Sequence, residues 1–87
     1  MTHEERTALA EMKGYTGANR VRYTRHALVR MAERGAVDED VLVALVNASS
    51  CRRQANGRFR VVGADRDGDE LELIVHLEGD VLIVTLF

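Results

Sequence analysis

Three turn signals divide the second half of this sequence into short segments that alternate apolar and polar residues. Asn56-Gly57, Asp67-Gly68 and Gly79-Asp80 are pairs that favour tight turns. Strands joined by such short turns must pair with their neighbours in the sequence, because a parallel connection needs a much longer crossover. This half of the chain therefore predicts a four-stranded antiparallel meander. The predicted strands are residues 51–54, 58–64, 70–77 and 81–86.

The predicted turns also fix which residues face one another across the sheet. A three-residue loop after Asp65 and a two-residue turn after Glu78 set the two registers. The resulting pairs are Asp65 with Asp69, Phe59 with Val75, Arg58 with His76, Glu78 with Val81, and Ile74 with Thr85. One face of the sheet then becomes continuously apolar. It carries Phe59, Val61, Leu71, Leu73, Val75, Leu77, Leu82, Val84 and Leu86.

The opposite face of the predicted sheet mixes charged groups with large apolar ones. Such a mixture predicts partial cover, either by the N-terminal helix or by a second copy of the chain. A homodimer through this outer face is therefore one expected assembly. The face carries Arg58, Arg60, Glu72, Ile74, His76, Ile83, Thr85 and Phe87.

The first half of the chain has the spacing of helices. Residues 25–34 follow Thr24, a favoured N-cap residue, and end before Gly35, which suits the left-handed position after a helix. Residues 39–47 follow Asp38 as a second N-cap. This second helix is apolar around most of its circumference, so we expect it to be the most buried helix of the domain.

Residues 1–19 form a separate segment in this interpretation. They open with a capping box at Thr2 and Glu5, and apolar residues follow at helical spacing before two glycines end the helix. The chain is thus predicted to have an N-terminal helical extension and one domain at residues 20–87. That domain is of the α+β class, with helices first and the antiparallel meander after them.

Composition places the chain among small globular proteins. Its 87 residues are 46% hydrophobic and 30% charged, which suits one compact domain. No apolar run is long enough to span a membrane, and the N-terminus lacks the order of a signal peptide, so we expect a cytoplasmic protein with no membrane partner. Cys51 is the single cysteine and no Cys/His cluster has zinc spacing, so neither a metal nor a cofactor is expected.

The net charge of −2 conceals a separation of charge along the chain. Arginines dominate residues 20–35 and 49–64, whereas acidic residues dominate 65–80. The acidic pI of about 5.9 argues against non-specific nucleic-acid binding by the whole surface. It leaves room for a local basic patch.

A stripe of ionisable residues on the first predicted helix of the domain is the candidate site. His26, Arg30 and Arg34 are spaced so that each step turns only about 40° around the helix axis, which places them on one stripe. An imidazole that can pass a proton then lies beside two guanidinium groups that bind phosphate. This set is typical of a site that holds a phosphodiester. An ordinary solvated face has the same spacing and is the alternative.

Several of these motifs together resemble a known family. They are Thr24-x-His26-Ala27-x-x-Arg30-Met31-x-x-Arg34-Gly35, the strand Gly57-Arg58-Phe59-Arg60-Val61 and the terminal Val81-Leu82-Ile83-Val84-Thr85. Over residues 21–87 the chain resembles the domain of unknown function family DUF4258. That family is similar to the RelE/ParE-type toxins and to the wider group of microbial ribonucleases with helices followed by a four-stranded antiparallel sheet.

The resemblance implies metal-independent RNA cleavage, in which a base removes the ribose 2′-hydroxyl proton and cations stabilise the charged phosphorane. His26 would transfer the proton, and Arg30 and Arg34 would clamp the phosphate. Thr85 would complete this catalytic set by bonding a phosphate oxygen. The implied RNA contacts are Tyr23, Arg58, Arg60 and His76. Tyr23 would stack on a base, and Arg58 or Arg60 would steer the RNA strand.

Two non-catalytic functions are the alternatives. A RelE/ParE-like module would bind a protein, and its arginine stripe would pair with carboxylates of that partner. A small homodimeric interaction domain is the other. A toxin of this type would in addition bind a cognate antitoxin. Three of the site residues also have structural interpretations: His26 as a helix-cap or core-edge histidine, His76 as a cross-strand partner of Arg58 or Glu72, and Thr85 as an ordinary strand residue.

Overall fold

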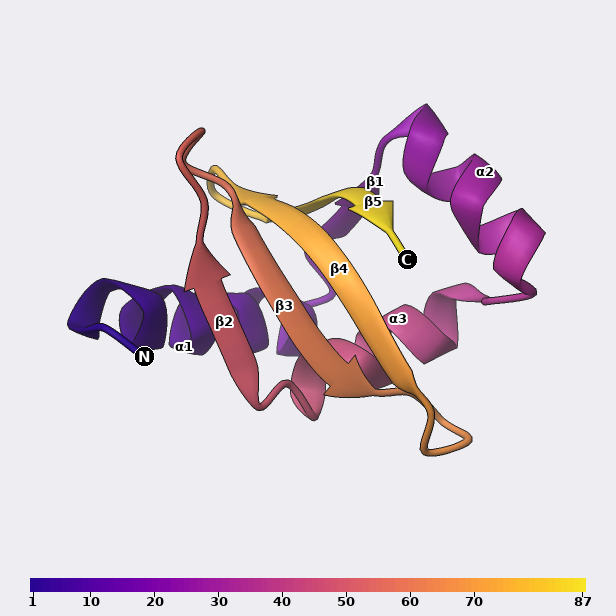
Figure 1. The fold of residues 1–87 in the computed structure, drawn as a ribbon, viewed down its shortest axis with the longest axis horizontal. Helices are drawn as coiled ribbons and strands as arrows, with labels where there is room; N and C mark the ends of the chain where they lie inside the picture. Colours follow the sequence, from indigo (N-terminus) through magenta and orange to yellow (C-terminus); the bar gives the residue numbers. More distant parts are fainter.

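The computed structural model describes residues 1–87 and folds them into three helices and a five-stranded sheet (Figure 1). The α+β class and the order of helices before the meander are confirmed. The elements are α1 (His3–Gly17), β1 (Val21–Tyr23), α2 (Arg25–Arg34), α3 (Asp38–Val46), β2 (Ser50–Arg53), β3 (Phe59–Ala64), β4 (Glu70–Leu77) and β5 (Val81–Leu86).

The sheet is larger than the predicted antiparallel meander. Strands β2 to β5 do form that meander, but β1 adds a fifth strand parallel to β5, so the order is β1-β5-β4-β3-β2 and the sheet is mixed. The backbone N–H of Val81 donates to Arg20 O at 2.9 Å, and that of Thr24 donates to Ile83 O at 3.0 Å. A strand of three residues is too short to show a period, so the sequence did not predict β1 as part of the sheet.

The register between β3 and β4 is confirmed, with Phe59 opposite Val75. The predicted pair of Arg58 with His76 is absent from the ladder because β3 begins only at Phe59. Asp65 N–H donates to Asp69 O at 2.8 Å, which confirms the predicted loop closure.

The register between β4 and β5 was predicted incorrectly at the turn. The turn has three residues and pairs Leu77 with Val81, so the predicted pair of Glu78 with Val81 is wrong. A bulge at Ile74/Val75 then shifts the ladder by one residue, and Ile74 still faces Thr85 as predicted. Between the turn and the bulge, the core-facing and outward-facing side chains of β5 are exchanged relative to the prediction. Val81 and Ile83 are therefore fully buried on the core face, in place of Leu82 and Val84.

Helices α1 and α3 cover one face of the sheet and leave the other face open, as Figure 1 shows from the open side. We call the open side the outer face. The approach of α3 to β3 requires Gly63, because a Cβ at this position would lie 1.9 Å from the carbonyl oxygen of Ala44. The core between these layers includes Met12 of α1, which has no exposed surface. The N-terminal helix thus packs into the same core as the meander.

The second predicted N-cap is corrected by one residue. Val37 is the N-cap of α3, and its backbone N–H donates to Asp40 Oδ2 at 3.0 Å. Asp38 is instead the first helical residue, and its carboxylate accepts a hydrogen bond from the Tyr23 hydroxyl. The carboxylate of Asp38, which the sequence predicted to cap the helix, binds the Tyr23 hydroxyl instead.

Candidate functional site

Thr24 fixes the start of α2 against the last strand. Its Oγ1 accepts from Ala27 N at 3.0 Å, as an N-cap does, and donates to Val84 O at 2.6 Å. Val84 is the residue that the bulge leaves between the paired Ile83 and Thr85. The hydroxyl therefore serves both as a cap and as a bond to a carbonyl that the bulge frees from the ladder.

The stripe on α2 divides into one bound and two free side chains. Arg30 Nε donates to Leu86 O at 3.1 Å, and the guanidinium lies 5.8 Å from the centre of the Phe87 ring. Arg30 Nη1 also lies 3.5 Å from Glu33 Oε1. His26 and Arg34 are exposed, and their side chains form no hydrogen bond or ion pair. The stripe therefore presents the imidazole of His26 and the guanidinium of Arg34 to solvent, and it holds the guanidinium of Arg30 against the sheet.

Arginines from two strands meet on the outer face. Arg52 of β2 lies directly opposite Arg60 of β3, and Arg60 in turn forms an ion pair with Glu72 of β4. Like charges placed directly opposite each other destabilise a sheet, and one carboxylate offsets only part of this repulsion. The Arg52 side chain has no acidic partner. The outer face therefore carries a net positive charge at β2 and β3.

Two adjoining hollows lie on this face. One, of about 200 Å³, is lined by Gln54, Arg60, Glu72, Ile74 and Phe87. The other, of about 360 Å³, is lined by Ser50, Arg52, Arg60, Val62 and Glu72. The Arg60–Glu72 pair is shared by both hollows and separates an apolar-floored pocket from a polar one. Phe87, which lines the first hollow, also contacts the guanidinium of Arg30 from α2.

The other predicted site residues lie in separate places. The Tyr23 hydroxyl donates to Asp38, and burial, followed by this hydrogen bond, raises the pKa of Tyr23. Thr85 Oγ1 is buried and has no hydrogen-bond partner. Arg58 lies exposed in the turn before β3. His76 Nε2 lies 3.3 Å from Glu78 Oε2, so its partner is neither Arg58 nor Glu72.

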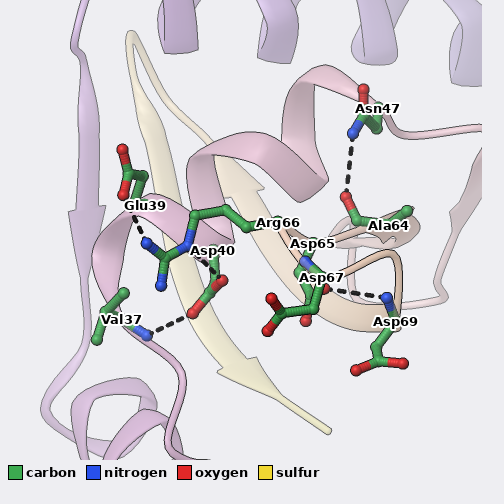
Figure 2. A network of polar contacts seen from close by, with 9 residues as sticks. All are labelled: Val37, Glu39, Asp40, Asn47, Ala64, Asp65, Arg66, Asp67 and Asp69. Atoms are coloured by element: carbon green, nitrogen blue, oxygen red, sulfur yellow. Dashed lines mark hydrogen bonds and ion pairs between the residues drawn. The ribbon is translucent and has the colours of Figure 1, made fainter.

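One polar network, shown in Figure 2, had no counterpart among the predicted site residues. Arg66, in the loop between β3 and β4, donates from Nε to Asp40 Oδ1 at 2.9 Å and from Nη1 to Glu39 Oε2 at 2.8 Å. The hydrogen bond from Arg66, together with that from the Val37 N–H, lowers the pKa of Asp40. The partners are 26 and 27 residues apart, so no local pattern indicates them.

The same network brings three carboxylates together. Oxygens of Asp40, Asp65 and Asp67 lie within 4.8 Å of one another, close enough to hold a cation. The guanidinium of Arg66 already supplies positive charge to Asp40, and Asp65 Oδ1 accepts from the backbone N–H of Asp67 and Asp69 at 2.9 and 3.0 Å. These bonds account for the cluster as a clamp that holds the loop against α3.

Cys51 lies away from both the stripe and the outer face. It is fully buried in the core, and burial raises the pKa of its thiol to about 11. A thiol in this state is a poor nucleophile at neutral pH. Cys51 is therefore a packing residue of the core.

The fold and these surfaces define a small α+β domain with a mixed sheet and one open, arginine-bearing face. No helix is long and apolar enough to cross a membrane. A family model described as Domain of unknown function (DUF4258) matches residues 23–87. The chain belongs to this family, and the predicted resemblance is confirmed at that level. No curated protein and no solved structure matches the chain.

Proposed function

We propose that this chain is a RelE-like, metal-independent endoribonuclease that binds RNA across the outer face of the sheet beside α2. The observation that carries this proposal is the convergence of arginines from three elements on one open face. Arg52 and Arg60 lie opposite each other on the sheet, and Arg30 bridges from α2 to its rim. A phosphate between the two strand arginines would relieve their repulsion and form charge-assisted hydrogen bonds with both.

The chemistry would take place at the exposed stripe of α2. His26 would remove the proton of the ribose 2′-hydroxyl as this oxygen attacks the phosphorus, and it would deliver that proton to the 5′-oxygen as the P–O5′ bond breaks. The products are a 2′,3′-cyclic phosphate and a 5′-hydroxyl. Arg34, which has no partner within the chain, is free to bind the phosphate during this step. Arg30 would hold the RNA-binding face and the helix in one orientation, because it bonds the backbone of β5.

Purified full-length protein incubated with RNA tests this proposal. We expect His26→Ala to reduce cleavage by about 10²-fold or more, and Arg34→Ala to reduce it by roughly tenfold, because each removes one group from the reacting phosphate. His3→Ala and Arg25→Ala are the matched controls, since both side chains are exposed on helices and form no hydrogen bond or ion pair. Intact RNA with the wild type at high protein concentration would refute the nuclease assignment.

A protein-binding module is the second candidate, and one observation favours it. Leu28 and Val29 of α2 are 52% and 50% exposed, which is unusual for large apolar side chains on a short helix. If α2 binds a protein such as an antitoxin, Leu28→Ser should abolish that complex and His26→Ala should not. In this case RNA stays intact with every variant, and the complex weakens with salt if Arg34 pairs with an acidic partner.

A further inference from the structure

The smaller hollow of the outer face, lined by residues of β3 and β4 together with Gln54 and Phe87, has the walls of a pocket for one flat, polar ring. Ile74, only 8% exposed, forms an apolar floor, and the ring of Phe87 forms an aromatic wall. The backbone N–H of Phe87 donates to Glu72 O at 2.9 Å, which holds the ring next to this carboxylate residue. At about 200 Å³ the hollow is smaller than the roughly 300–1,000 Å³ of drug-sized sites, so it suits a single base.

The polar groups of this pocket have free hydrogen-bonding capacity. Arg60 contacts Glu72 through Nε and Nη2, and both contacts reach the same oxygen, Oε1. Glu72 Oε2 therefore has no partner within the chain, and an ionised carboxylate has several lone pairs available. The amide of Gln54 also lines the pocket without a hydrogen bond of its own. The pocket thus offers a strong acceptor flanked by donors, above an apolar floor and beside an aromatic ring.

We propose that this pocket binds a guanine base, an inference that rests on the proposed function and names the base it selects. The Watson–Crick edge of guanine presents two adjacent donors, N1–H and N2–H. One would bond to the free Oε2 of Glu72, and the other would bond to Oε1 in place of one of its two Arg60 contacts. The adjacent O6 acceptor would receive a bond from Arg60 or Gln54. The ring would stack on Phe87, whose other contact is the guanidinium of Arg30.

The other bases fit the carboxylate less well. Adenine and cytosine each place a ring acceptor beside their exocyclic amine, so one carboxylate oxygen would face a lone pair instead of a donor. Uracil has a single N–H between two carbonyl oxygens, which the carboxylate would repel. Only guanine offers two neighbouring donors to two acceptor oxygens. The selectivity arises because adenine, cytosine or uracil would leave polar groups of the pocket unpaired or repelled. Such groups cost more binding free energy than the loss of one contact.

Titration of the full chain with nucleoside monophosphates tests the pocket without any cleavage. We expect GMP to bind at least about tenfold more tightly than AMP, CMP or UMP. Glu72→Gln should remove this preference, because the amide replaces one acceptor with a donor. Glu70→Gln is the matched control, since Glu70 lies two residues away on the same strand and face but does not line the pocket. Phe87→Leu should weaken GMP binding and preserve the fold, because the ring is 47% exposed.

A second arm distinguishes a guanine within RNA from a free nucleotide. Short oligonucleotides with 2′-deoxy sugars, with and without one guanine, bind but cannot be cleaved through a 2′-oxygen. Tighter binding of the guanine oligonucleotide, lost in Glu72→Gln, supports a base pocket for RNA. Preference for GMP alone would place the ligand among free nucleotides. Equal binding of all four nucleotides, or binding of none of them, would overturn the guanine assignment even if RNA is cleaved. A preference for GMP combined with intact RNA would overturn only the proposed nuclease function.

Discussion

Gly63 is the position at which a single methyl group should most clearly disturb the fold. An alanine Cβ there would lie 1.9 Å from Ala44 O, 2.9 Å from Ala44 C and 3.1 Å from Ala48 Cα. All three atoms are backbone, so no rotamer change relieves the overlap and α3 must move away from β3. Overpacking of a well-packed core costs typically about 1–3 kcal/mol. We expect a loss of about 2–3 kcal/mol for Gly63→Ala, because backbone yields less easily than side chains.

Thermal and urea denaturation of the full chain measure this loss. For a domain of this size, 1 kcal/mol corresponds to roughly 4–8 °C in Tm, so Gly63→Ala should melt roughly 10–20 °C below the wild type. Gly14→Ala is the matched control, because Gly14 lies within α1 and a Cβ there meets nothing within 4 Å. That control should gain about 0.5–1 kcal/mol from helix propensity. A Gly63→Ala protein as stable as the wild type would refute the close contact between α3 and β3.

Two further stability changes follow from the polar contacts. Thr24→Val removes the cap of α2 and leaves Val84 O without its donor. We therefore expect the free energy of unfolding, measured by urea denaturation, to fall by about 1–2 kcal/mol. Thr24→Ser keeps the hydroxyl and should retain most of this stability. Asp40 has a lowered pKa in the folded state, so its contribution to stability is present above the ordinary value of 3.8 and is lost as the pH falls through the lowered pKa. Denaturation midpoints measured from pH 6 downward should therefore fall less steeply in Asp40→Asn than in the wild type. An equal slope in both proteins would contradict the pairing with Arg66.

The parts of the fold that the sequence predicted correctly are those set by local chemistry. The helix at residues 25–34 was predicted with its observed bounds, because Thr24 and Gly35 mark both of its ends. The β3–β4 register was predicted because Gly68 takes the left-handed conformation that a three-residue loop requires, with φ of 83°. In contrast, β1 depends on a partner some 60 residues later in the chain, and no local signal announces a parallel neighbour.

The candidate site was predictable in its residues but not in its arrangement. Helical spacing placed His26, Arg30 and Arg34 on one stripe, and the structure keeps them on α2. What spacing does not show is that Arg30 turns to Leu86 O and Phe87, 56 residues away in the first case. The Arg52–Arg60 pair was also missed as a feature, because it appears only once β2 and β3 are aligned. Tertiary contacts therefore decide which arginines are free to bind a ligand.

The bulge in β5 links the fold to the outer face. In a regular strand with Val81 and Ile83 in the core, Thr85 and Phe87 would also point inward and Leu86 would point outward. The extra residue at Val84 reverses this alternation, so Leu86 is fully buried and Phe87 lies at the outer pocket. The same residue gives up its carbonyl to Thr24, which sets the start of α2. The bulge therefore positions both the Phe87 ring that forms the aromatic wall of the pocket and the helix whose Arg30 contacts that ring.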